Sequence, residues 1–274
     1  METQIVALLC EGPHDAEFLS RILRFNGFSS NDGLEIKNYP SPINNFLKTE
    51  AIKTNIDDLN LITVRHVLLP YCTLRNENSF FLIYSMIGVG QKEKRKQLLN
   101  DFFTLIPKEN EYNEHFPIGT ELGISYFFDA DDKGIDTRTL ELNEEINEVL
   151  GIKPFNSHKE IYIHQGLKLS SFIFTGNDNS KGKLEDLLMP LMKKDNETIF
   201  DNADDFLANH FDDERKAQKY DKDKSIIGIV GQLQISGASN TVCIKKSDYL
   251  NEEKIKENYK CKEIVDFINS HIIK

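Results

Sequence analysis

Short apolar runs that alternate with amphipathic helical segments are the feature that most limits how this chain can fold. The first run, QIVALLCEG (4–12), is followed at once by PHDAEFLSRILRF (13–25), in which apolar side chains recur at helical spacing. A proline at the first helical position and acidic residues in the first turn mark the start of that helix. The same strand-then-helix order recurs at 79–106 and 121–151. The alternation predicts an α/β fold with a mostly parallel sheet flanked by helices.

The rest of the chain is expected to elaborate this core within a single domain, residues 1–274. We place the core at about 1–32 and 79–175, an insertion at 33–78, and a C-terminal elaboration of helix and strand at 176–274. The individual expectations are a helix at 43–53, β-rich segments at 61–74 and 159–176, helices at 183–194 and 197–214, and a final lobe joining SIIGIVGQLQISGASNTVCI (225–244) to a helix near 251–273.

The composition is that of an ordinary soluble globular protein, with 39% hydrophobic and 28% charged residues. No window approaches the 18 consecutive apolar residues of a membrane span, so no membrane partner is expected. The opening METQIVALLCEG lacks the basic region and cleavage site of a signal peptide. The four cysteines lie far apart and form no CxxC pair. We therefore expect a cytoplasmic protein with reduced thiols.

The charge balance is acidic, with 33 Lys and Arg against 44 Asp and Glu and a net charge of −11. Proteins that bind long nucleic acid through its phosphates usually need a basic surface. The balance therefore argues against non-specific DNA binding. It remains compatible with a metal-dependent nuclease, because bound cations offset acidity at the site itself.

Two of the expected strands end in carboxylates. Glu11 ends the first, and ISYFFDADDKG (124–134) runs from apolar residues into Asp129, Asp131 and Asp132. The carboxyl ends of parallel strands meet at one edge of a sheet, where ligands collect. Asp129 and Asp131 are two apart, so in an extended chain they point to the same side. Like charges this close repel, and a divalent cation relieves the repulsion; a solvated turn is the alternative.

Several named motifs can be compared with DADDKG. An EF-hand needs an oxygen ligand at the fifth position, where Lys133 stands, and it needs a helix before the loop. A DxDx[TV] phosphatase motif is excluded by the same lysine. A glycosyltransferase DxD stays open. His14, in the EGPHD turn, is interpreted as a structural or supporting residue.

LLCEGPHDAEFL (8–19) and YFFDADDKG (126–134) together resemble the TOPRIM domain of topoisomerases, primases and OLD-family nucleases. The EGxxD form is most similar to small stand-alone TOPRIM proteins related to the OLD nucleases. GKLEDLLMPLM (182–192) resembles the helix that supplies a further acid in that group, and KSIIGIVGQLQISGASN (224–240) resembles a C-terminal segment of such proteins. The resemblance implies a Rossmann-like TOPRIM core, enlarged by the insertion at 33–78.

The resemblance also implies roles for individual residues. Asp129 and Asp131 would hold Mg²⁺ or Mn²⁺, with Glu185 on the same or a second ion. Glu11 would be a ligand or a general acid–base, and Lys224 would neutralise a phosphate oxygen unless it is only a solvated surface lysine. The supporting residues would be Gly12, Asp15, Asp132 and Asp186.

The function expected on this basis is metal-dependent phosphodiester chemistry on nucleic acid, DNA or RNA, by a TOPRIM-type nuclease, with an ATPase as a candidate partner. A non-catalytic protein that binds metal together with a nucleotide or nucleic acid is the runner-up. A DxD glycosyltransferase comes third. None of the nine tyrosines stands in the context of a topoisomerase nucleophile, so DNA relaxation is not expected.

Overall fold

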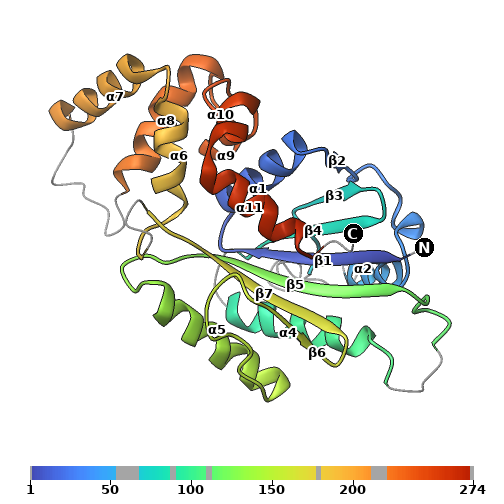
Figure 1. Ribbon diagram of the computed structural model, residues 1–274. Helices are drawn as coiled ribbons and strands as arrows, with labels where there is room; N and C mark the ends of the chain where they lie inside the picture. The colour runs from blue at the N-terminus through green and yellow to red at the C-terminus, as the bar shows by residue number, and fades with distance from the viewer. Residues whose placement is uncertain are drawn as a thin grey trace.

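The computed structural model describes residues 2–53, 68–86, 91–108, 113–176, 180–210 and 221–271. Within them the chain forms a seven-stranded sheet in the order β2-β3-β4-β1-β5-β7-β6 (Figure 1). The strands are β1 (Thr3–Cys10), β2 (Ser29–Ser30), β3 (Cys72–Asn76), β4 (Ser79–Ser85), β5 (Thr120–Asp129), β6 (Ile161–His164) and β7 (Leu167–Phe174).

The centre of the sheet is parallel and its edges are antiparallel. Strand β1 pairs in parallel with β4 on one side and with β5 on the other, and β5 pairs in parallel with β7. The outer pairs β2–β3, β3–β4 and β6–β7 are antiparallel. The predicted α/β fold with a mostly parallel sheet is therefore confirmed.

Helices cover both faces of the sheet (Figure 1). Helices α2, α4 and α5 pack on one face, and α1 and α6 to α11 contribute to the core on the other. The helices are α1 (Pro13–Phe25), α2 (Ile43–Ile52), α4 (Gln91–Leu105), α5 (Ile135–Leu150), α6 (Leu184–Lys193), α7 (Glu197–His210), α8 (Lys222–Gln234), α9 (Asn240–Lys246), α10 (Glu252–Glu257) and α11 (Tyr259–Asn269), with a 3₁₀ turn η1 (Ile36–Asn38).

Strand β1 shows why the central strands read as unbroken apolar runs. Side chains alternate between faces along a strand, so Ile5 and Leu9 join the core under α4 and α5, whereas Val6 and Leu8 join the core under α1. Each of these four side chains is almost fully buried. Because helices cover both faces, neither face of the strand can be polar.

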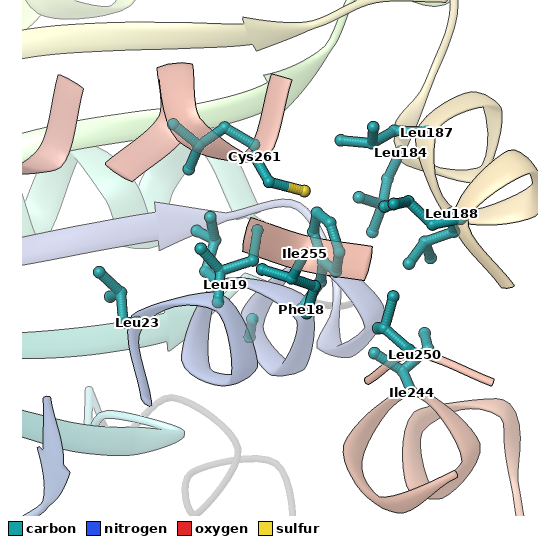
Figure 2. Close-up of a cluster of buried hydrophobic side chains, with 14 of the residues drawn as sticks. Phe18, Leu19, Leu23, Leu184, Leu187, Leu188, Ile244, Leu250, Ile255 and Cys261 are labelled. Atoms are coloured by element: carbon teal, nitrogen blue, oxygen red, sulfur yellow. The ribbon is translucent and has the colours of Figure 1, made fainter. Parts of the chain in front are cut away.

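The core on the α1 side holds α6 in place. Leu184, Leu187 and Leu188 stand at helical spacing on one side of α6 and point into a cluster that contains Phe18 of α1 and Cys261 of α11 (Figure 2). All five are buried, each at most 6% exposed. This packing fixes the rotation of α6, and with it the direction in which the intervening Glu185 faces.

The stretch 33–78 contributes η1, α2 and strand β3, which lies between β2 and β4, and the helix predicted at 43–53 is confirmed as α2. Half of the β-rich segment predicted at 61–74 lies outside the described residues, which resume at Leu68; β3 begins in the other half, at Cys72. The helix predicted at 197–214 is present as α7 to His210, and its last residues also lie outside them.

The expectation of strand in the C-terminal lobe is wrong for the residues that the structure describes from Leu184 onward, which form helices. SIIGIVG belongs to α8 because Ile226, Ile227 and Val230 form a helical stripe that is buried. The Asp221 side chain caps this helix by accepting a hydrogen bond from the Lys224 backbone N–H. Across the described ranges, no helix is both long and apolar enough to cross a membrane.

Candidate functional site

The carboxylates that end β1 and β5 lie side by side. The two strands are parallel neighbours, with Cys10 opposite Phe127, so Glu11 and Asp129 emerge at the same edge of the sheet. The Asp129 backbone N–H lies 3.3 Å from Glu11 Oε1 and donates a hydrogen bond to it. We call Glu11, Asp129 and the acids around them, namely Asp15, Asp131 and Glu185, the acidic cluster.

Asp15 closes the first turn of α1, which begins directly after Glu11. Its Oδ2 accepts a hydrogen bond from the Gly12 backbone N–H at 2.8 Å. Its side chain is buried, and this burial, together with the nearby charges of Glu11 and Glu185, raises the pKa of Asp15 to about 7. Gly12 therefore serves the site through its backbone, and Asp15 adds a carboxyl that holds a proton more tightly than an ordinary aspartate.

Asp129 has the more strongly shifted carboxyl. Burial is the largest cause, the charges of Asp15, Glu11 and Glu185 add to it, and the pKa rises to about 9. One opposing contact is the hydrogen bond that its Oδ1 accepts from the Leu184 backbone N–H at 2.8 Å. Asp129 thus joins the end of β5 to the start of α6, and its raised pKa favours the protonated carboxyl at neutral pH.

Glu185 reaches the same cluster from α6. Its side chain is 2% exposed, and its Oε1 lies 3.5 Å from His14 Nδ1 and 3.2 Å from Lys224 Nζ. Burial acts to raise the pKa of Glu185, but the hydrogen bond with His14 and the charge of Lys224 outweigh it, so the pKa is lowered. The structure therefore brings Glu185 and Lys224 together with the strand-end acids, and it gives His14 a partner within the site.

Asp131 departs from the geometry that the sequence suggested. Its φ of 48° takes the chain out of extended conformation, so the rule that residues two apart share a side does not apply. Its backbone forms two hydrogen bonds with Gly182, at 2.7 and 3.0 Å, which tie the loop to the start of α6. The Asp131 side chain is 47% exposed and pairs with Arg138. The extended-chain argument for Asp129 and Asp131 therefore does not apply, and their joint binding of one ion stays a prediction.

Gly182 sits where a side chain cannot fit. Its φ is +120°, and a Cβ there would lie 2.4 Å from the Gly176 backbone nitrogen and 2.5 Å from Asp186 Oδ2. Asp186 itself accepts a hydrogen bond from the Lys183 backbone N–H at 2.8 Å, the same closure that Asp15 makes at α1. Asp186 thus closes the first turn of α6. Asp132, which follows Asp131 in the loop after β5, is exposed to solvent.

Arg138 is a member of the site that the sequence interpretation missed. From the first turn of α5, its Nε donates to the Asp129 carbonyl oxygen at 2.8 Å and its Nη1 to Glu141 at 3.1 Å. Its Nη2 pairs with Asp131 and lies 3.5 Å from Glu11 Oε1. A cation in the first turn of a helix opposes the helix dipole, and that mismatch was the indication available in the sequence.

The donors of the cluster suit a hard divalent cation, since Mg²⁺ and Mn²⁺ prefer carboxylate oxygens. Among the described residues, no three His, Cys, Asp or Glu side chains stand ready to hold a metal ion together. Mg²⁺ needs only one or two carboxylates besides water and phosphate. Glu11 and Asp129 supply that number of carboxylates, because they end neighbouring parallel strands. Burial is the first cause that raises the pKa of both; Arg138 opposes the rise at Glu11, and neighbouring acids add to the rise at both. A cation would relieve this strain.

Comparison with known proteins gives a family and a distant structural likeness. The profile of a family described as "Protein of unknown function (DUF3226)" matches residues 6–272. No curated protein matches the chain. Among solved structures, it is similar to the crystal structure of hypothetical protein PH0156 from Pyrococcus horikoshii OT3, at 15% identity and a TM-score of 0.48, over 98% of this chain and 95% of that one. The whole acidic cluster lies inside the region that the family profile matches.

Proposed function

The chain belongs to the DUF3226 family, and we propose that its acidic cluster performs metal-dependent phosphodiester chemistry on nucleic acid, as a nuclease of TOPRIM type. The observation that carries the proposal is the contact between Glu11 and Asp129, which end neighbouring parallel strands and bring two carboxyls with raised pKa values together. Burying like charges costs free energy unless a ligand compensates for it. Perturbed carboxyls at the carboxyl edge of a parallel sheet are typical of functional sites.

Glu11 and Asp129 are the residues that would hold Mg²⁺ or Mn²⁺, with Glu185 beside them. Asp131 would join them after exchanging its partner Arg138. A bound divalent ion would stabilise the charge that develops on the phosphate and favour ionisation of a water. Side chains of the protein would neutralise the phosphate, orient the substrate and move a proton.

Basic side chains around the cluster support a phosphate substrate. Arg138 approaches from α5, and Lys183 and Lys224 approach from the α6 and α8 side, so positive charge lies on both sides of the acids. A nuclease of net charge −11 needs such a local arrangement, since its overall charge repels nucleic acid. His14 contacts Glu185 through Nδ1, and this contact places its imidazole at the site as a candidate general acid or base.

A second candidate function is binding without turnover. It is favoured by the pairing of Asp131 with Arg138 and of Glu185 with Lys224, which gives the metal-free site its own counter-ions. A protein of this kind would bind a metal and a nucleotide or nucleic acid at the same edge of the sheet, without cleaving the phosphodiester.

The test begins with chelator-treated protein and thermal unfolding in a Mg²⁺ or Mn²⁺ titration. Binding at one hundred times Kd stabilises a protein by about 2.7 kcal/mol, which corresponds to roughly 5–10 °C for a chain of this size. Asp129→Asn combined with Asp131→Asn should abolish the rise. Asp132→Asn, in the same loop but exposed, is the matched control and should keep it.

Cleavage is then measured on end-labelled single- and double-stranded DNA and RNA with the same proteins. Metal-dependent cutting by the wild type and the Asp132→Asn control, but not by the double variant, supports the nuclease. A melting shift without cutting favours the binding protein. If neither Mg²⁺ nor Mn²⁺ shifts the wild type, both candidate functions are refuted and the DADDKG loop is only a structural turn.

A further inference from the structure

Arg138 makes an unusual set of contacts for a residue in the first turn of a helix. Its guanidinium uses three different nitrogens on different partners: Nε on the Asp129 carbonyl, Nη1 on Glu141, and Nη2 on Asp131 with Glu11 nearby. The side chain is only 16% exposed. Nε and Nη1 anchor the arginine on the Asp129 carbonyl and on Glu141, and Nη2 faces the carboxylates of Glu11 and Asp131.

The position of Nη2 matters because of what it neutralises. Glu11 and Asp131 would both be ligands of a divalent cation under the proposed function, and in this structure they share one guanidinium nitrogen instead. A metal ion and Arg138 would compete for the same carboxylate oxygens. On the other side of the cluster, Lys224 pairs with Glu185 in the same manner.

We propose that Arg138 is an exchangeable counter-ion of the acidic cluster, which divalent metal displaces from Glu11 and Asp131 and which then binds a phosphate oxygen of the substrate. The proposal rests on the proposed function, since it assigns a role at the same site. The anchors at Nε and Nη1 keep the guanidinium in place when Nη2 changes partner. Metal binding thereby creates an anion site, so metal and phosphate bind with positive coupling.

The contact set explains why the residue is arginine. A planar guanidinium presents donors in fixed directions, so one edge can stay anchored while the other changes partner. A lysine ammonium at this position would have no second donor group to hold its place once its carboxylate partners had turned to a metal. The Arg138→Lys variant therefore keeps the positive charge but loses the anchoring hydrogen bonds, and it tests the two contributions separately.

The experiment uses the full chain and three variants. Arg138→Gln removes the counter-ion, and Arg138→Lys keeps the charge without the fork. Lys133→Gln is the matched control, because Lys133 is a cation of the same loop, 50% exposed, and pairs with Glu141. Isothermal titration calorimetry of chelator-treated protein gives the Mg²⁺ affinity. Thermal unfolding with inorganic phosphate, with and without Mg²⁺, gives the anion coupling.

We expect Arg138→Gln to bind Mg²⁺ about tenfold more tightly than the wild type, within the usual range of coupling between two ligands of one site. Its metal-free melting temperature should fall, because Glu11 and Asp131 then repel each other, and Mg²⁺ should restore more of it than in the wild type. Phosphate should stabilise the wild type more in the presence of Mg²⁺ than in its absence. Arg138→Gln should lose that gain and Arg138→Lys should weaken it, whereas Lys133→Gln should behave as the wild type.

Two outcomes are kept distinct. If the wild type binds Mg²⁺ and Arg138→Gln binds it equally or more weakly, the counter-ion proposal is refuted and the proposed function stands. If neither protein binds Mg²⁺ or Mn²⁺, the proposed function is refuted as well. Should Arg138→Gln fail to fold without metal, Arg138→Lys decides: unchanged phosphate coupling in that variant refutes the role of the guanidinium.

Discussion

Replacing Asp129 by asparagine should make the metal-free protein more stable, although the residue ends a central strand. The pKa of Asp129 rises from 3.8 to about 9 on folding, through burial first and then through the charges of Asp15, Glu11 and Glu185. At neutral pH the folded protein must therefore hold a proton that the unfolded chain releases. Asparagine has the same shape, carries no charge, and can still accept the hydrogen bond from the Leu184 backbone N–H.

The magnitude follows from linkage. A pKa raised from 3.8 to about 9 costs about 1.4 kcal/mol for each pH unit above the unfolded value, which gives an upper limit of about 4 kcal/mol at pH 7. Part of the Asp129 side chain reaches solvent, so we expect about half of this, or about 2 kcal/mol. For a chain of this length that is a rise of about 5 °C in melting temperature.

The sign sets the pH dependence. Because the folded-state pKa is the higher one, stability from the protonated carboxyl is fully present below about pH 4 and is lost as the pH rises toward 9. The advantage of Asp129→Asn over the wild type should therefore vanish near pH 4 and grow up to about pH 9. Asp131→Asn is the control, since its exposed carboxylate pairs with Arg138 and its loss should not stabilise the protein.

The assay is thermal unfolding in a chelator across that pH range, with chemical denaturation at pH 5 and pH 8 to convert temperature into free energy. A variant that is less stable than the wild type at pH 8, or whose advantage is the same at every pH, would refute the reasoning. Asp129 would then be ionised in the folded protein and stabilised by its surroundings, and the acidic cluster would have no unrelieved repulsion for a metal to remove.

Two further predictions test the frame around the site. Gly182→Ala should lower the unfolding free energy by more than about 2 kcal/mol in chemical denaturation, because its Cβ would lie 2.4 Å from a backbone nitrogen. Gly237→Ala is the control, since Gly237 also has a positive φ but a Cβ there would have nothing within 4 Å, and it should cost clearly less. Equal costs in the two variants would refute the steric clash and leave backbone strain as the cause. Burial lowers the pKa of His271 from 6.5 to about 4, so between these two pH values the unfolded chain binds a proton that the folded protein does not. The wild type should therefore lose up to about 3 kcal/mol of stability as the pH falls from 6.5 to 4. His271→Gln, which can keep the contact with Ser170, should lack this loss. If thermal unfolding shows the same loss of stability at acid pH in this variant as in the wild type, His271 is not its cause.

The sequence predicted the elements of the sheet well because both of its faces are buried. An unbroken apolar run such as that of β1 places side chains in the cores on both faces of the sheet, and the first charged residue after the run marks the carboxyl end of the strand. That is why Glu11 and Asp129 could be placed together from their positions alone. The resemblance pointed to Glu185, and the buried leucines of α6 fix the direction in which it faces.

What the sequence did not predict depends on single backbone and side-chain conformations. The run SIIGIVG suits a strand or a buried helix equally, and the Asp221 cap decides for the helix. The left-handed conformation of Asp131 sends its side chain to Arg138, a partner seven residues later on another element. Neither choice is encoded in periodicity. The helix at SIIGIVG depends on a local cap, and the conformation of Asp131 depends on contacts with Gly182 and Arg138 that form only when α5 and α6 are in place.

Four departures from local rules meet at this edge of the sheet. Asp129 and Asp15 have raised pKa values from burial, Asp131 adopts a left-handed conformation, Arg138 stands in the first turn of a helix, and Gly182 tolerates no Cβ. The raised pKa values and the left-handed conformation of Asp131 each cost free energy, whereas Arg138 neutralises neighbouring acids. Folded proteins keep such features together where function requires them. Arg138 supports the site independently of the motif resemblance, because it lies outside the segments that carry the resemblance.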